Sequence, residues 1–192
     1  MSERLWIFTD PDLASLDVYI DREKISQVEI VHKVYEVARH FGDVTRVEII
    51  TESAGDDAYL EHIGKDEQSV KEQKPSDALI SFVTNSPDVT DMRFNLGTYC
   101  VDETGDERWM AGAVTLSFWV DPNDVEWAFY INVNTDLFVP FRFVKDERTE
   151  RMARWNAPKL KRLLEEILRT FPVVSWEWDY CYSALKEYLE QI

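Results

Sequence analysis

Long hydrophobic runs are missing from this chain of 192 residues. The first ten residues hold no apolar run of the length that a secretory signal peptide requires. No stretch approaches the roughly 20 apolar residues that span a bilayer as a helix. We therefore expect a cytoplasmic protein with no membrane partner. Hydrophobic residues still make up 45% of the chain, which is enough for a buried core.

Cysteine, histidine and glycine are also scarce, with two, three and six residues respectively. We expect Cys100 and Cys181 to be free thiols in a reducing compartment. No histidine pair has the spacing of a zinc site, and no glycine cluster has the spacing of a phosphate-binding loop. We therefore expect no metal, no cofactor and no catalytic residue. An enzyme whose carboxylate site carries no recognised motif stays open as an alternative.

Negative charge is abundant and unevenly distributed. The chain has 37 acidic and 21 basic residues, a formal net charge of -16. Residues 86–128 hold nine acids and two bases and are rich in aromatic residues, whereas residues 129–192 are neutral overall. The phosphate backbone would be repelled, so we expect no nucleic-acid partner. Carboxylates beside aromatic side chains indicate a surface that captures a cationic partner.

One segment has the opposite sign. Residues 142–169 contain nine bases and five acids. This charge pattern predicts a solvated helix face that complements the acidic remainder of the protein.

The first half of the chain predicts mixed secondary structure. Apolar residues at helical spacing predict a helix over 25–41, ended by Gly42 in the left-handed conformation. Residues 52–77 read as an exposed acidic loop with a short helix over 56–63. The other expected elements are strands over 5–8 and 45–51 and a helix over 78–84.

From residue 92 the apolar period changes to two, which is typical of strands. Acidic turns follow the first and second strands, and a third turn precedes a fourth strand in which Pro140 indicates an edge or a bulge. The expected strands cover 92–101, 109–120, 125–133 and 137–144. We predict an antiparallel β-meander over about 92–144.

The last third predicts helices around one more strand. Leu160 to Leu168 form an apolar stripe with Pro158 near the first turn of the helix. A strand over 174–180 and a helix over 184–189 follow. The sequence therefore predicts a single α+β domain over 1–192, with helices packed mainly on one face of the antiparallel sheet.

The meander supplies the candidate binding residues. Successive turns of a meander lie at opposite ends of the sheet, so the two acidic turns are not expected to form one cluster. Between them, two tryptophans share the face of the second strand opposite its core residues. That face is either a recognition surface or is covered by a loop or helix. The predicted partner-binding residues are Asp102, Glu103, Asp106, Glu107, Trp109, Trp119, Asp121 and Asp124.

Two further stretches carry a resemblance. Asn134–Phe141, followed by a charged segment and by Trp155–Leu160 opening a helix, resembles small bacterial cytosolic proteins of uncharacterised families. Some of these families resemble immunity proteins of bacterial toxin systems. The resemblance implies a cytosolic protein that neutralises a toxin.

These observations lead to one leading hypothesis. The protein is expected to be an acidic binding protein that occludes a basic protein partner, most concretely as an immunity protein against a bacterial toxin. A nucleic-acid mimic that inhibits a DNA-binding protein is an alternative, because carboxylates spaced like phosphates can take their place. A homodimer formed through the exposed aromatic residues also stays open.

Overall fold

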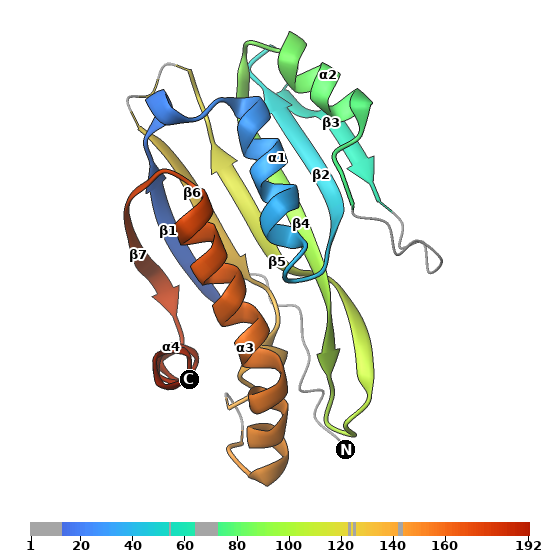
Figure 1. The fold of residues 1–192 in the computed structure, drawn as a ribbon, viewed down its shortest axis with the longest axis vertical. Coiled ribbons are helices and arrows are strands. Elements are labelled where there is room, and N and C mark those ends of the chain that lie inside the picture. Colours follow the sequence, from blue (N-terminus) through green and yellow to red (C-terminus); the bar gives the residue numbers. More distant parts are fainter. Residues whose placement is uncertain (1–12, 54, 64–72, 123, 125, 142–143) are drawn as a thin grey trace.

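One antiparallel sheet runs through nearly the whole length of the chain (Figure 1). The computed structural model describes residues 13–192 except 54, 64–72, 123, 125 and 142–143. The described residues form seven strands in the spatial order β3-β2-β4-β5-β6-β1-β7, and every neighbouring pair is antiparallel. The strands are β1 (Ala14–Ile20), β2 (Asp43–Thr51), β3 (Gly55–His62), β4 (Val89–Val101), β5 (Glu107–Trp119), β6 (Trp127–Val133) and β7 (Val173–Cys181).

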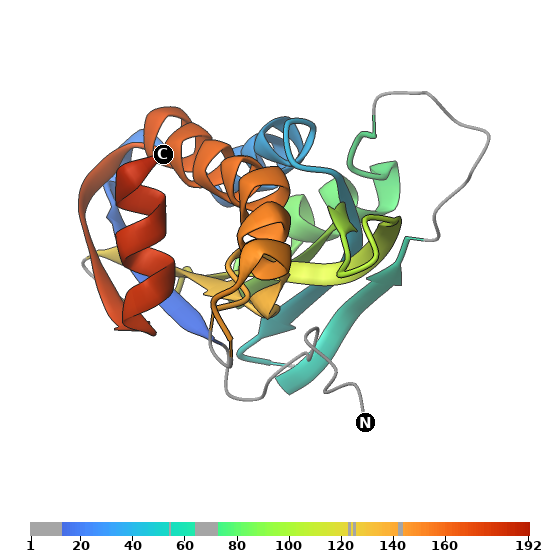
Figure 2. The same cartoon turned by 90° about the horizontal axis from the view of Figure 1, so that it is seen from below.

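The described residues also form four α-helices, and Figure 2 shows these helices on one side of the sheet. This arrangement confirms the predicted α+β class with an antiparallel meander, here β4-β5-β6. The sheet face beneath the helices is apolar, with Phe94, Phe118 and Phe129 fully buried on adjacent strands. The helices are α1 (Gln27–Ala38), α2 (Asp77–Asn85), α3 (Glu147–Thr170) and α4 (Ser183–Gln191).

The fourth strand predicted for the meander is wrong. Asp136–Phe138 form a 3-10 helix, and Leu137, Phe138 and Val139 are buried one after another. Strand side chains alternate between two faces, whereas this tight turn buries three consecutive side chains in the core. The position beside β6 is taken by β1 instead, which pairs with β6 and β7.

Strand β1 was not expected from the sequence, although its period-two pattern is clear. Ala14, Leu16, Val18 and Ile20 are buried, and the residues between them point to the other face of the sheet. The strand predicted over 5–8 lies outside the described residues.

Part of the predicted acidic loop is also a strand. Residues 55–62 form β3, so the short helix expected over 56–63 is wrong. Tyr59 of β3 packs against Phe82 of α2, with ring centroids 5.1 Å apart. This contact packs α2 against β3, which is an edge strand of the sheet, and the helix predicted at α2 is confirmed.

Helix α3 begins much earlier than the sequence pattern indicated. Asp146 caps it, accepting a hydrogen bond from the Thr149 backbone N–H at 2.9 Å, and Pro158 lies inside the helix rather than in its first turn. Its apolar residues continue the spacing of three and four toward the N-terminus through Met152, Ala153 and Ala157. The charged residues between them interrupt the apolar pattern, so this part of the helix was not predicted.

Gly42 follows α1 for a different reason from the one predicted. Among the glycines that the structure describes, Gly105 and Gly112 have a positive φ. A Cβ atom at Gly42 would lie 2.0 Å from the Gly97 carbonyl oxygen. Gly42 is therefore required by the close approach of two backbones, at the point where α1 turns into β2.

Asn156 fastens α3 to the sheet. Its side chain is fully buried. Its Oδ1 accepts from the Val101 N–H at 2.8 Å, and its Nδ2 donates to the carbonyls of Val101 and Leu137, both at 2.9 Å. One amide thereby satisfies backbone groups at the end of β4 and in the segment after β6.

Replacing Asn156 with leucine should destabilise the fold by about 3 kcal/mol, because three buried backbone groups lose their partner. Urea unfolding followed by circular dichroism measures this loss. The exposed neighbour Arg154 provides a control, since Arg154→Leu should change stability by less than about 0.5 kcal/mol. Equal stabilities of the two variants would contradict the role assigned to Asn156.

Candidate functional site

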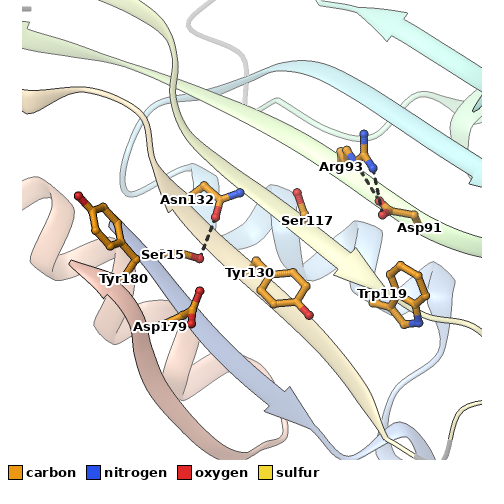
Figure 3. A pocket seen from close by; sticks show the side chains of 9 residues that line it. All are labelled: Ser15, Asp91, Arg93, Ser117, Trp119, Tyr130, Asn132, Asp179 and Tyr180. Carbon is orange, nitrogen blue, oxygen red and sulfur yellow. Dashed lines mark hydrogen bonds and ion pairs between the residues drawn. The ribbon is translucent and has the colours of Figure 1, made fainter. Parts of the chain in front are cut away.

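The sheet face opposite the helices holds the strongest candidate site. No helix formed by the described residues covers this helix-free face (Figure 2). A shallow hollow of about 720 Å³ lies on it, across strands β4, β5, β6, β1 and β7 (Figure 3). We call it the sheet-face hollow; it is lined by Ser15, Asp91, Arg93, Ser117, Trp119, Tyr130, Asn132, Asp179 and Tyr180.

Three aromatic side chains stand out of this face. Trp119 is 48% exposed, Tyr130 38% and Tyr180 56%. They come from β5, β6 and β7, and strand pairing brings them together: Ser117 lies opposite Tyr130, and Ser15 lies opposite Tyr180. Exposed aromatic residues of large area are typical anchors of protein interfaces.

Carboxylates accompany the aromatic residues. Asp91 forms an ion pair with Arg93, with an Nε–Oδ1 distance of 3.3 Å. Burial raises the pKa of Asp91 from its ordinary value, and Arg93 offsets only part of that rise. Asp179 lines the opposite side of the hollow, and Figure 3 shows it near Ser15 and Tyr180.

Asp17 adds a third carboxylate to the same face. It lies opposite Tyr130 of β6 on one side and Glu177 of β7 on the other. Burial raises the pKa of Asp17, and the carboxylates of Asp179 and Glu177 raise it further. Its Oδ1 is buried without a hydrogen-bond partner among the described residues. A bound cation would offset the energetic cost of burying the ionised Asp17 carboxylate and its repulsion by the neighbouring carboxylates.

One end of this face includes three of the residues predicted from sequence. The Trp119 Nε1 donates to the Asp124 Oδ2 at 2.6 Å, so the exposed indole is held in one orientation. Asp121 lies in the same turn, and its backbone carbonyl accepts from the buried Trp127 indole at 3.2 Å. Trp127 is 8% exposed and belongs to the hydrophobic core.

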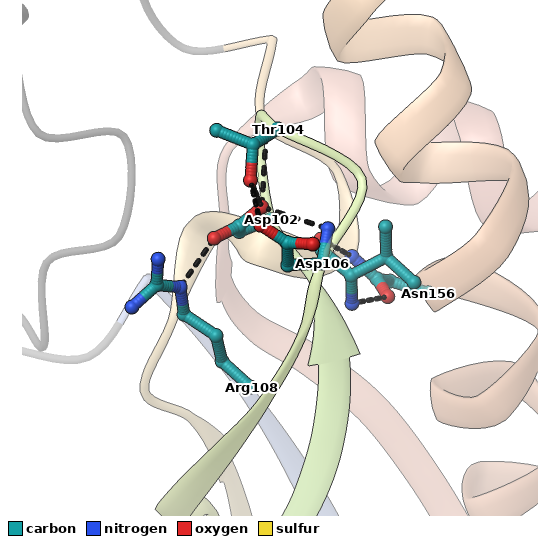
Figure 4. A network of polar contacts seen from close by, with 6 residues as sticks. Asp102, Thr104, Asp106, Arg108 and Asn156 are labelled. Carbon is teal, nitrogen blue, oxygen red and sulfur yellow. Dashed lines mark hydrogen bonds and ion pairs between the residues drawn. The ribbon is translucent and has the colours of Figure 1, made fainter.

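The other five predicted residues lie at the far end of β5, and Asp102 among them is structural. It is buried and accepts hydrogen bonds from the Thr104 N–H at 2.8 Å, the Thr104 hydroxyl at 2.6 Å and the Asp106 N–H at 3.1 Å (Figure 4). Arg108 forms an ion pair with it. Burial alone would raise the pKa of Asp102, but these hydrogen bonds hold it well below its ordinary range.

The neighbours of Asp102 in this hairpin are mostly engaged as well. Glu103 pairs with Arg148 of α3 at 3.2 Å, and Asp106 accepts from the Thr104 hydroxyl at 2.6 Å. Trp109 is half-buried against Tyr99, with ring centroids 5.2 Å apart. The carboxylates of the acidic hairpin therefore stabilise this end of the sheet, and their role in partner binding stays a prediction.

The strand register confirms that the two acidic turns do not form one cluster. Glu107 pairs with Val101 at one end of β5, and Trp119 pairs with Asp91 at the other. The residues that pair with Trp109 and Trp119 are Tyr99 and Asp91, which are eight positions and therefore roughly 26 Å apart along β4. Glu107 is exposed at the hairpin end.

Sequence reasoning missed most of the sheet-face hollow. Tyr130 belonged to a recognised alternating strand, where it falls opposite the core residues Phe129 and Ile131. That position was a usable signal for the helix-free face. Asp17 and Asp179 had no comparable signal, because they meet Tyr130 only through the placement of β1 between β6 and β7.

The described part of the chain offers neither a metal site nor a reactive cysteine. It contains no group of three His, Cys, Asp or Glu side chains that could hold a metal ion. Burial raises the pKa of the Cys100 thiol to about 12, only partly opposed by Lys159, so this thiol is protonated at neutral pH. Cys100 and Cys181 are both free, as predicted. None of the described helices is long and apolar enough to cross a membrane.

Three comparisons with known proteins bear on this chain. No family model, no curated protein and no solved structure matches it. Any assignment of function therefore depends on the geometry described above.

Replacing Trp119 with alanine should leave the melting temperature nearly unchanged, because this side chain is half exposed on the helix-free face. Trp127→Ala should instead cost about 3–5 kcal/mol, because Trp127 is only 8% exposed and its loss leaves a cavity. Thermal unfolding of both variants separates the two cases. Equal large losses would show that the face around Trp119 is covered.

The acidic hairpin predicts a particular pH dependence. A carboxylate whose folded-state pKa is lowered stabilises the fold above its unfolded pKa, and this contribution is lost as the pH falls through the folded value. Asp102→Asn should therefore destabilise the protein at pH 7 by more than about 1 kcal/mol. The difference should shrink from about pH 5 downward.

Urea unfolding across this pH range measures the effect of Asp102→Asn. The exposed carboxylate of Glu107 on the same hairpin gives the control, because Glu107→Gln should have little effect at any pH. A loss that stays constant with pH would remove the charge of Asp102 from the explanation.

Proposed function

We propose that this protein binds and occludes a basic protein partner, with the helix-free face of its sheet as the contact surface. The observation that supports this proposal is the sheet-face hollow, where Trp119, Tyr130 and Tyr180 are exposed beside Asp91 and Asp179. Aromatic rings and carboxylates together recognise lysine and arginine side chains, by cation–π contact and by ion pairing.

Electrostatics support the same partner chemistry. The protein carries a net charge of -16, which accelerates the encounter with a basic protein at low ionic strength. At the contact itself, an arginine near Asp17 would stabilise the ionised form of this carboxyl group. Burial and the charges of Asp179 and Glu177 disfavour that form when no partner is bound. Binding would then favour the ionised form of Asp17, so affinity should rise with pH through its raised pKa.

The surface suits occlusion better than catalysis. The hollow is shallow and open, and four of its polar residues are already paired: the Ser15 hydroxyl donates to the Asn132 Oδ1 at 3.0 Å, and Arg93 pairs with Asp91. Catalytic sites need a cleft that excludes water around the reacting atoms. A broad face of this kind can instead cover a cleft on another protein.

The more specific form of the proposal is an immunity protein of a bacterial toxin system that acts in the cytoplasm. Its support is the resemblance of Asn134–Phe141 and Trp155–Leu160 to such small cytosolic proteins. In this form the helix-free face covers the basic active-site cleft of the toxin and keeps its substrate out.

We expect Asp179→Lys to weaken binding of a cationic partner about tenfold or more, because it reverses a charge inside the contact surface. Trp119→Ala should weaken it similarly through loss of an anchor. A peptide of alternating arginine and leucine serves as the first probe, with affinity measured by fluorescence anisotropy across ionic strength.

The matched control is Glu107→Lys, which makes the same charge change on an exposed residue at the other end of β5. It should reduce affinity much less than Asp179→Lys does. Equal effects would show that overall charge, and not the helix-free face, governs binding. An immunity protein is expected to be encoded next to its toxin. For the immunity role, the wild-type protein should protect cells that express a toxin gene found immediately upstream of its own gene, and the Asp179→Lys variant should not.

A further inference from the structure

Helix α3 carries a second surface, of opposite charge, that the proposed function does not use. Trp155 is 64% exposed at the middle of this helix of 24 residues. At 100° per residue, the side chains within about 45° of Trp155 form one stripe along the helix. We call it the α3 stripe; it consists of Arg148, Arg151, Trp155, Lys159, Arg162, Glu166 and Arg169.

Carboxylates of the protein itself occupy both ends of the α3 stripe. Arg148 pairs with Glu103 from the β4–β5 hairpin at 3.2 Å, and Arg169 pairs with Glu166. Lys159 donates to the Tyr99 carbonyl at 2.6 Å. The stripe therefore already binds a carboxylate that comes from another segment of the chain.

The middle of the stripe is open. Arg151 and Arg162 are exposed on either side of Trp155, and neither forms an ion pair with a residue that the structure describes. Eleven residues separate them, which corresponds to roughly 16 Å along the helix axis. Arg151, Trp155 and Arg162 therefore follow one another along the same exposed side of the helix.

We propose that the α3 stripe binds an acidic helical segment of a partner protein. Two carboxylates on that segment, roughly 16 Å apart, would pair with Arg151 and Arg162. An apolar side chain between them would cover the indole of Trp155. Arginine and tryptophan are the residues that most often dominate the energy of such contacts.

The surroundings of the stripe favour a short acidic segment over other anions. Glu147 and Glu165 are exposed on α3 beside the stripe, and the protein as a whole carries a net charge of -16. A nucleic-acid strand or a membrane surface extends well beyond 16 Å and would meet these carboxylates. A helical segment of three turns is about 16 Å long and contacts only the stripe.

This surface is independent of the sheet-face hollow. The helices lie on one side of the sheet and the hollow on the other, as Figures 2 and 3 show. A partner on the α3 stripe would leave the helix-free face accessible. Failure of binding at one surface therefore says nothing about the other.

The test uses a helical peptide that carries glutamate near both ends and leucine on the same face between them. We expect saturable binding to the full chain that weakens as salt is added. Arg151→Glu and Trp155→Ala should each reduce the affinity about tenfold or more. Asp179→Lys, on the opposite face, should leave this affinity within about twofold, since distant sites act independently.

The matched control is Arg154→Glu. Arg154 is exposed on α3 and has the same charge as Arg151, but it points about 100° away from Trp155. It should retain most of the affinity, and circular dichroism should show that all variants keep their fold. Equal losses from Arg151→Glu and Arg154→Glu would overturn the stripe as a defined site.

Two further probes test the choice of partner. A single-stranded oligonucleotide and vesicles of phosphatidylglycerol present phosphate in place of carboxylate. Neither should bind at physiological salt. Binding of either in preference to the acidic peptide, or no binding of the peptide at all, would overturn the proposal.

Discussion

Burial of one face of the seven-stranded sheet beneath α1 and α3 is the constraint on which the rest of this structure depends. Strand side chains alternate, so covering one face with helices commits every second residue of each strand to the other face. The core face collects Phe94, Phe118 and Phe129, and the helix-free face receives the hydroxyls, carboxylates and tyrosines between such residues. The sheet-face hollow is therefore a direct consequence of how the core is built.

Polar contacts then attach the helix layer to the sheet at one end of the molecule. Asn156 ties α3 to β4, and Glu103 of the neighbouring hairpin pairs with Arg148. Asp102 organises that hairpin from within through four donors. Several carboxylates that contribute to the large negative charge thus form hydrogen bonds and ion pairs within the protein. Their presence in an acidic stretch does not make them a binding surface.

The remaining charge is separated between two sides of the molecule. Carboxylates and exposed aromatic rings lie on the helix-free face, whereas arginines surround Trp155 on α3. Separation of this kind suits a protein that meets partners of different charge, because each surface attracts one partner and repels the other. The two proposals follow from the same electrostatic arrangement and depend on different residues.

Local periodicity was sufficient to predict helices α1 and α4 and strands β2, β4, β5 and β6, because each buries one face against a neighbour and shows it in its own residues. Strand β7 was predicted from its alternating residues, although none of them is fully buried. It failed where burial is not periodic, as in Leu137 to Val139, and where charged residues interrupt the apolar stripe, as in the first half of α3.

What the sequence by itself determined is therefore the fold class, the core face of most strands and the charge of each segment. Only the tertiary structure decided that β1 lies between β6 and β7, bringing Asp17, Tyr130 and Asp179 onto one surface. Likewise, only the fold showed that Asp102 is buried while Trp119 is exposed. The physical reason is that strand pairing joins residues distant in sequence, and local patterns do not specify which strands become neighbours.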